Sequence, residues 1–250
     1  MTRAFTLSSS GFAPINRKLV GKSSTGDRPG HEALAVVLQV RDEVLKVLLW
    51  QRARAPFAGS WALPGGVLEP GETLEQSIRR HLAAKVDVRE LAHLEQLETR
   101  SDPARHPEDW VVATAYLGLV PADLDPVLPG DTAWHAVDEL PEPAFDHREL
   151  ALAGRERLRA KLSYTNAGFA LAPREFTISE LRALYGAALG HEVSATNLQR
   201  VLLRRRLLEP TGEQRASGRT GGRPATVFRF RRRALEVTDP FAVLRPPGAR

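Results

Sequence analysis

Two apolar runs, separated by only two polar residues, set the strongest limit on how this chain folds. The stretches HEALAVVLQV (31–40) and EVLKVLLWQR (43–52) are rich in branched side chains, and only Arg41 and Asp42 lie between them. Branched residues suit the pleated, half-buried surface of a sheet, and a short polar link places successive strands side by side. The sequence therefore predicts a pair of buried strands near the start of the first domain.

Helical and extended patterns then alternate as far as about residue 165. From Thr73 to about Val86 an apolar residue recurs at every fourth position, and Thr73 with Gln76 forms the pattern of a capping box. The segment 110–120 has the composition of a strand, and the segment 147–162 has the spacing of a helix. Strands mixed with helices at these distances predict a layered α/β domain.

The pattern changes after this domain. FTISELRALYGAALG (176–190) begins with Thr177 as the N-cap and Glu180 in a second capping box, and Gly190 ends the helix. A second helix is predicted at about 195–208, followed by a strand, a Gly/Arg loop and a further strand. This order predicts a winged helix-turn-helix. The chain then divides into a tail (1–30), an α/β domain (31–168) and a winged helix-turn-helix domain (169–250).

Positive charge is concentrated in the C-terminal part of the chain. Residues 196–233 contain eleven arginines, no lysine and two glutamates, a balance of +9, which leaves −4 for the rest of a chain whose net charge is +5. A basic segment joined to a mildly acidic body favours a polyanionic partner. The alternative is a basic face that is merely solvated.

The second predicted helix has the residues that reading DNA requires. Asn197, Arg200 and Arg204 share one face, and Leu198 and Leu202 lie on another, where they can pack on the preceding helix. Arginine bonds to guanine and asparagine to adenine in the major groove. Duplex DNA is favoured over RNA because no aromatic platform for stacking bases is evident. The predicted DNA contacts are Thr177, Thr196, Asn197, Arg200 and Arg204, together with Arg219 and Arg223 of the Gly/Arg loop.

Composition excludes several other classes. The chain has no cysteine, so disulfides and thiolate metal sites are excluded, and its seven histidines are never three or four residues apart, as a zinc site would favour. No apolar run is long enough to span a membrane, and the N-terminus lacks the apolar core of a signal peptide. We expect a cytoplasmic protein with no metal and no cofactor.

Residues 65–88, GGVLEPGETLEQSIRRHLAAKVDV, resemble the Nudix box, the motif with which Nudix hydrolases hold divalent cations on a diphosphate. The preceding FAGSWALPGG (57–66) is also typical of Nudix domains. The resemblance implies a Nudix-like α/β sandwich, and Glu72 and Arg80 are expected to pair and to fix the loop against the helix. The residues that match the box are Gly66, Glu72, Arg80, Leu82 and Val88.

The three glutamates that follow the arginine in the Nudix box are missing. His81, Ala84 and Lys85 occupy their positions, at spacings that bring side chains to one side of a helix. Acids there would bind the hard cations that activate water, whereas a lysine repels them. The sequence therefore predicts a scaffold without catalysis. The alternative is an active ADP-ribose pyrophosphatase with a rearranged metal site that uses Glu69, Glu72 or Glu75.

A nucleoside diphosphate that binds without a metal needs cationic partners. Arg52 and Arg54 follow the second strand, and we expect them to line the pocket; the alternative is that they are strand-edge charges. Phe57 or Trp61 is expected to pack on the adenine or ribose, with Asp146 and His147 at the far end. The predicted effector-binding residues are Arg52, Arg54, Phe57, Trp61, Glu72, Arg80, Asp146 and His147.

Nearly the whole chain after residue 30 is similar to the Nudix-related transcriptional regulators of NAD metabolism. The resemblance rests on WHAVDELPEPAFDHREL (134–150), on 176–190 and on LLEPTGE…GGRPATVFRF (207–230). It implies a homodimeric repressor that binds operator DNA near NAD biosynthesis or salvage genes, with ADP-ribose as effector. Because a single winged helix reads only a few base pairs, we expect the operator to be an imperfect inverted repeat. The short connection FALAPREF (169–176) lacks a flexible glycine-serine run, which favours mechanical coupling between the domains. A third reading, an RNA-binding accessory protein, is the least favoured.

Overall fold

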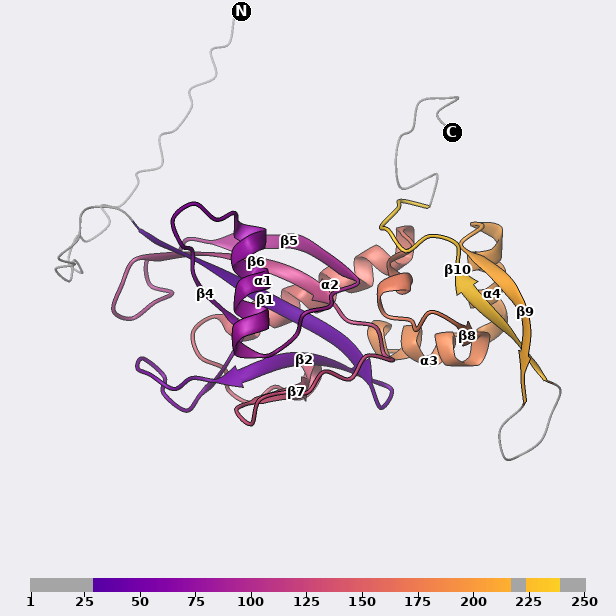
Figure 1. Cartoon of the computed structure of the whole chain (residues 1–250), viewed down its shortest axis with the longest axis horizontal. Helices are drawn as coiled ribbons and strands as arrows, with labels where there is room; N and C mark the ends of the chain where they lie inside the picture. The colour runs from indigo at the N-terminus through magenta and orange to yellow at the C-terminus, as the bar shows by residue number, and fades with distance from the viewer. Residues whose placement is uncertain (1–28, 217–223, 239–250) are drawn as a thin grey trace, which may run out of the picture.

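The computed structural model describes residues 29–216 and 224–238. They form a mixed sheet that lies between two helices, followed by a smaller winged-helix unit at one end (Figure 1). Within these ranges, no helix has both the length and the apolar character needed to cross a membrane. The strands of the large sheet are β1 (Gly30–Arg41), β2 (Val44–Gln51), β3 (Trp61–Ala62), β4 (Gly65–Val67), β5 (His93–Arg100), β6 (Val111–Leu119) and β7 (Thr132–Ala136). The helices are α1 (Leu74–Lys85) and α2 (His147–Tyr164), with short 3-10 turns η1 (Val137–Glu139) and η2 (Ala167–Ala170).

The predicted pair of buried strands is confirmed as the antiparallel hairpin β1–β2, in which Leu38 faces Val47. The main path of the sheet runs β3-β2-β1-β6-β5, while β4 pairs with β1 and β7 pairs with β2. Only β1 and β6 run parallel; the other pairs are antiparallel. Strand β1 is the middle strand of the main path and pairs with β2, β4 and β6.

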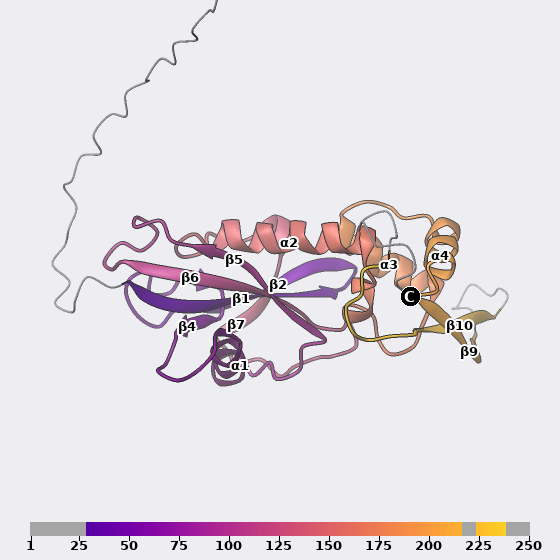
Figure 2. The ribbon, with the colours of Figure 1, turned by 90° about the horizontal axis from the view of Figure 1, so that it is seen from above.

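Both faces of β1 are buried, because α1 and α2 cover opposite sides of the sheet (Figure 2). Val36 and Leu38 belong to the core cluster under α2, whereas Ala35 and Val37 belong to the cluster under α1. Alternate side chains of a strand point to opposite faces, so a continuous apolar run is what a doubly covered strand requires.

Both predicted capping boxes are confirmed. Thr73 Oγ1 accepts the Gln76 N–H of α1, and the Gln76 side chain accepts the Thr73 N–H in return. Thr177 and Glu180 make the same reciprocal pair at the start of the next helix, α3 (Ile178–Leu189). Gly190 ends α3 in a left-handed conformation, with φ of 76°. These helix ends depend on residues three positions apart, which is why the sequence predicts them well.

The winged-helix unit also contains α4 (Ala195–Arg204) and a small sheet in the order β8-β10-β9. The prediction that the second helix extends to about residue 208 is wrong, since α4 ends at Arg204. Leu207 and Leu208 are buried, and Leu208 already pairs with Phe230 across the small sheet. The chain therefore leaves the helix at this point because Leu207 and Leu208 are buried at the start of β9. The strands are β8 (Phe176–Thr177), β9 (Leu208–Arg215) and β10 (Ala225–Phe230).

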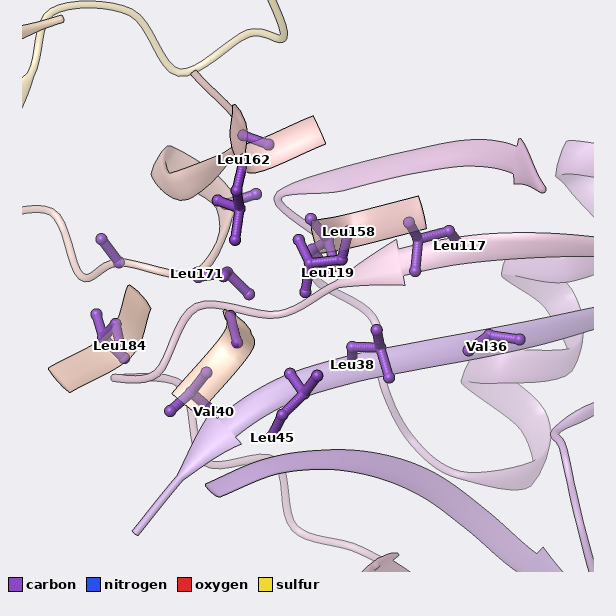
Figure 3. Close-up of a cluster of buried hydrophobic side chains, with 14 of the residues drawn as sticks. Val36, Leu38, Val40, Leu45, Leu117, Leu119, Leu158, Leu162, Leu171 and Leu184 are labelled. Atoms are coloured by element: carbon purple, nitrogen blue, oxygen red, sulfur yellow. The ribbon is translucent and has the colours of Figure 1, made fainter. Parts of the chain in front are cut away.

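One hydrophobic core runs from the large sheet into the winged-helix unit. A single cluster of buried side chains contains Val40 and Leu45 of the sheet, Leu162 of α2, Leu171 at the end of η2 and Leu184 of α3 (Figure 3). The predicted domain boundary after residue 168 falls within η2, whose residues are all buried. The first part of the connection, up to Ala172, is therefore buried, whereas Arg174 is exposed.

Candidate functional site

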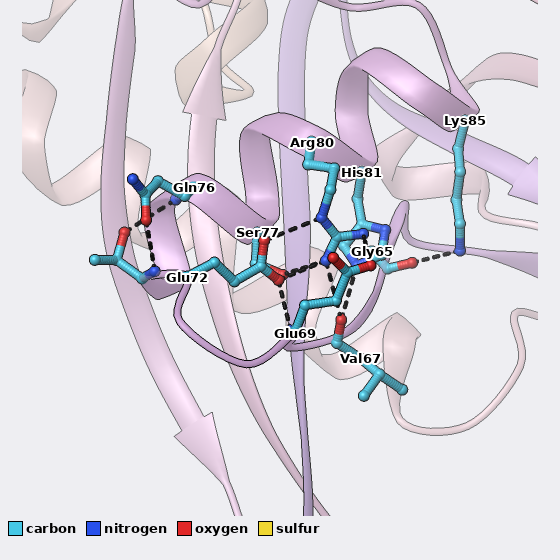
Figure 4. Close-up of polar contacts among 10 residues, drawn as sticks. Gly65, Val67, Glu69, Glu72, Gln76, Ser77, Arg80, His81 and Lys85 are labelled. Carbon is cyan, nitrogen blue, oxygen red and sulfur yellow. Dashed lines mark hydrogen bonds and ion pairs between the residues drawn. The ribbon is translucent and has the colours of Figure 1, made fainter.

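The glycine pair that opens the Nudix-like segment is explained by close packing. A Cβ atom on Gly65 would lie 2.2 Å from the backbone oxygen of Ala33, so only glycine lets β4 approach β1 this closely. A Cβ atom on Gly66 would lie 2.7 Å from the imidazole of His81. Gly65 thus fixes the position of its own carbonyl, to which Lys85 points (Figure 4). Gly66 leaves room for the His81 ring, which replaces the first missing acid.

The helix face that would hold metal-binding acids carries a cation. Lys85 Nζ donates to Gly65 O at 2.5 Å and lies 4.3 Å from the centre of the Trp50 ring. Burial, and then the nearby charge of Arg52, lowers the pKa of Lys85 below its ordinary value. His81 is buried with Nε2 3.3 Å from Val67 O, and burial lowers the pKa of its ring. Ala84 offers no ligand atom. These residues do not fit a divalent cation.

The acids that remain on this segment are bound to arginines. Arg80 donates from Nε to Glu72 Oε2 at 3.0 Å and from Nη2 to Glu72 Oε1 at 2.5 Å, which confirms the predicted pair. The hydrogen bond from Arg80 holds the pKa of Glu72 at about 2. Glu69 lies 3.3 Å from Arg80, and Glu75 pairs with Arg79 at 2.9 Å. In the part of the chain that is described, no three acids or histidines are grouped to hold a metal.

A group of aromatic rings lies at the end of β2. Arg52 stacks 4.7 Å from the centre of the Phe145 ring, and its Nε donates to Pro56 O at 2.9 Å. Phe57 meets the same ring edge-on at 4.9 Å, and His106 stacks on it at 5.1 Å. Phe57 remains exposed, as an aromatic side chain that contacts a ligand would be. The structure therefore brings Arg52 and Phe57 next to the Phe145–His147 segment.

A buried arginine that the sequence did not single out supports this group. The Arg105 side chain is only 2% exposed. Its Nη1 donates to Glu32 Oε1 at 2.8 Å, and its Nη2 and Nε donate to Asp146 at 2.8 and 3.2 Å. Burial by itself would raise the pKa of Asp146, but the hydrogen bond and charge of Arg105 leave it below its ordinary value. Arg105 thus joins β1, the loop after β5 and the start of α2.

His147 is held as a neutral acceptor. Its Nδ1 accepts the N–H of Leu63 at 3.0 Å, and burial lowers its pKa to about 3. A neutral ring that accepts at Nδ1 carries its proton on Nε2, which is buried and has no partner among the described residues. The Trp61 ring packs edge-on against His135 at 4.3 Å, and Arg54 lies exposed on the loop after β2. Whether these residues bind an effector stays a prediction.

The face of α4 that the sequence assigns to DNA is exposed. Leu198 and Leu202 are buried on the opposite side, as predicted. Arg200 Nη2 donates to Asn197 Oδ1 at 2.8 Å, so these side chains lie together on the surface. The exposed predicted contacts on this helix are Thr196, Asn197, Arg200 and Arg204.

The other predicted DNA contacts are placed differently. Thr177 is 7% exposed, and its hydroxyl caps α3 by accepting the Glu180 N–H. Arg219 and Arg223 lie outside the described residues. Arg215, at the end of β9, pairs with Glu180 and ties the base of the wing to α3. Contact of any of these residues with DNA stays a prediction.

Comparison with known proteins agrees with this arrangement. Residues 30–153 match the model of the NUDIX domain, and residues 168–230 match that of the NrtR DNA-binding winged helix domain. The chain is 33% identical to the NrtR of Shewanella oneidensis, over 80% of this chain and 93% of that one, with a TM-score of 0.70. The same protein in a crystal complex with a 27mer DNA gives 33% identity, 80% and 92% coverage and a TM-score of 0.68.

A curated relative extends the comparison. The chain is 29% identical to the "ADPR responsive transcriptional repressor NtrR" of Acinetobacter baylyi, over 78% of this chain and 79% of the relative. The solved structures and this relative therefore contain both domains in the order seen here. With its NUDIX domain followed by a DNA-binding winged helix, this chain belongs to the NrtR family of regulators.

Proposed function

We propose that this protein is a transcriptional repressor of NAD biosynthesis or salvage genes that senses ADP-ribose or a related nucleotide. The observation that carries the proposal is the two-domain match to a protein solved with DNA and to one named as an ADPR-responsive repressor. The exposed Asn/Arg face of α4 supports it independently, because it supplies the side chains that read base edges.

The proposed recognition surface is the outer face of α4. Asn197 and Arg200 read bases or the adjacent backbone, and Thr196 and Arg204 bind phosphates. Arg219 and Arg223 of the wing are proposed to reach phosphates or the minor groove. A single winged helix reads only a few base pairs, so a homodimer on an inverted repeat is proposed as the working form.

The proposed effector site lies at the carboxyl end of β2. Arg52 with Arg54 supplies charge for the diphosphate, and Phe57 offers an exposed ring for the adenine or ribose. Asp146 and His147 form the far end, where Arg105 holds the start of α2.

Binding without hydrolysis is part of the proposal. The acids of the rearranged-site alternative are engaged by arginines, and the helix face presents Lys85 and neutral His81. With magnesium or manganese, purified protein is expected to release no AMP from ADP-ribose above a buffer control. Metal-dependent release of AMP that disappears in Glu72→Gln would establish the pyrophosphatase instead.

The two sites are joined by α2. Its N-terminal end carries Asp146 and His147, and near its other end the Arg159 side chain donates to Ala188 O of α3 at 3.3 Å. Ser163 O also accepts from Arg205, which directly follows α4. An 18-residue helix is about 27 Å long. A shift at the effector end therefore reaches the helices that bind DNA.

The decisive experiment measures both ligands on one protein. Duplex DNA from upstream of NAD biosynthesis genes is labelled and titrated by fluorescence anisotropy, with and without ADP-ribose. We expect tight, sequence-dependent binding that ADP-ribose weakens about 5- to 150-fold, which corresponds to coupling of about 1–3 kcal/mol. Structured RNA and unrelated duplex serve as controls. Equal affinities with and without ADP-ribose would remove the sensor role, and preference for RNA would remove the repressor role.

A further inference from the structure

Two cations at the proposed effector site have only neutral partners. Lys85 donates to a backbone oxygen and lies over the Trp50 ring; Arg52 donates to a backbone oxygen and lies over the Phe145 ring. No carboxylate of the described residues lies within ion-pair distance of either, although most other cations of this domain are paired, as Arg80 is with Glu72. The positive charge of Lys85 and Arg52 is therefore not neutralised by contact.

The acid that acts electrostatically on both cations is already bound to another arginine. Glu32 of β1 acts electrostatically on Arg52 and on Lys85, but its Oε1 accepts from the buried Arg105 at 2.8 Å. Arg105 also pairs with Asp146, so the charges of Glu32, Asp146 and Arg105 sum to about −1. Together with Arg52 and Lys85, the cluster stays net positive.

Lys85 lies where its positive charge can bind an anion. It stands on the face of α1 on which metal-binding acids would stand, and its ammonium is fixed on Gly65 O, whose position the packing of β4 on β1 determines. An ammonium has three donors, and Gly65 O takes one of them. The partly exposed Lys85 side chain thus keeps donors and charge for an incoming anion.

We propose that the protein binds the diphosphate of its effector without a divalent cation, and that Lys85 together with Arg52 supplies the charge that a metal supplies in a hydrolase. This inference rests on the proposed effector and adds how it is held. Two unit charges match a diphosphate diester, and the desolvated surroundings strengthen charge-assisted hydrogen bonds. Lys85 and Arg52 bind the diphosphate but do not activate a water molecule to attack it, so the proposed mode of binding leaves the effector intact.

The test is calorimetry of ADP-ribose binding to the full-length protein in excess EDTA and again in magnesium. We expect the same Kd in both. Lys85→Gln keeps a donor for Gly65 O but removes the charge, and is expected to raise the Kd about 10- to 150-fold, the value of one charge-assisted hydrogen bond. Lys85→Arg keeps the charge and is expected to lose less. Lys46→Gln removes a lysine paired with Asp42 and is expected to bind as the parent does.

The outcomes are distinguishable. Binding that needs magnesium overturns the metal-free proposal but leaves the ADP-ribose sensor intact. Binding of Lys85→Gln equal to the parent in EDTA removes Lys85 from the site. No binding under any condition contradicts the proposed function itself. The affinity of each variant for duplex DNA and its melting temperature report whether it is folded, and the EDTA comparison on the parent decides the metal question even if Lys85→Gln fails to fold.

Discussion

Removal of Arg105 is the substitution with the largest expected effect on stability at the proposed effector site. Its guanidinium is 2% exposed, and it donates three hydrogen bonds to Glu32 and Asp146, whose side chains are 20% and 19% exposed. Arg105→Ala would leave two largely buried carboxylates without their partner. Breaking a buried ion pair in this way costs about 3–5 kcal/mol.

The structure places the expected cost at the lower end of that range. Both carboxylates keep some contact with solvent, which can solvate them in part when the arginine is removed. We therefore expect Arg105→Ala to lower the free energy of unfolding by about 3 kcal/mol. Arg100→Ala is the matched control: Arg100 pairs with Glu98, but both side chains are about one third exposed, so a loss of about 0–1 kcal/mol is expected.

Urea denaturation followed by tryptophan fluorescence measures both changes. A triple variant, Arg105→Met with Glu32→Gln and Asp146→Asn, separates the ion triad from packing, because it removes all three charges together. We expect it to recover part of the stability lost in Arg105→Ala. If Arg105→Ala costs no more than Arg100→Ala, the buried triad does not hold the start of α2, and the reasoning about this site is wrong.

Three further predictions concern other parts of the molecule. Burial lowers the pKa of His147 from 6.5 to about 3. The neutral ring therefore contributes its full share to the free energy of unfolding above pH 6.5, and this share falls by about 2 kcal/mol between pH 6.5 and about 5, as the ring of the unfolded chain takes up a proton. The free energy of unfolding of His147→Asn, measured by urea denaturation, is expected to depend less on pH in this range. Gly65→Ala is expected to lower the melting temperature, because the new Cβ atom would collide with backbone atoms of β1. Gly71→Ala is the control: it has open space around the Cβ position but a positive φ, so it measures the cost of backbone strain without a collision. Arg200→Ala is expected to weaken operator binding by about 1–3 kcal/mol and to relax specificity, while Arg79→Ala on α1 leaves DNA binding unchanged, as anisotropy would show.

Local signals explain which parts of the fold the sequence predicts. The β1–β2 pair follows from a continuous apolar run, and both capping boxes follow from residues three positions apart. Strand β5 has no such signal: HLEQLETR places one buried residue among polar ones, because it is an edge strand that pairs only with β6. The end of α4 depends on the burial of Leu207 and Leu208 against residues distant in the sequence. A prediction from helical composition alone therefore makes this helix too long.

The candidate site divides in the same way. Glu72 and Arg80 lie eight residues apart around one turn and one helix, and their pairing follows from the motif. Arg105 comes from a polar loop, and its partners are 73 and 41 residues away, so nothing in its neighbourhood distinguishes it from a solvated arginine. The role of Lys85 was equally hidden, since the sequence shows that an acid is missing but not that the ammonium is fixed on Gly65 O.

The shared core explains why a packed connection suits a sensor better than a flexible one. Leu171 and Leu184 belong to the same buried cluster as Val40 of the sheet, and the N–H of Asn166 donates to Glu236 O beyond β10. Close-packed interiors have few intermediate arrangements, so a displacement of α2 is transmitted to α3 and not absorbed. Under the proposed function, ADP-ribose weakens DNA binding through this packed connection, and thermodynamic linkage then requires DNA to weaken ADP-ribose binding by the same factor. A glycine-serine linker inserted at the η2 turn is therefore expected to keep both binding sites and to remove the coupling between them, so that neither ligand changes the affinity of the other.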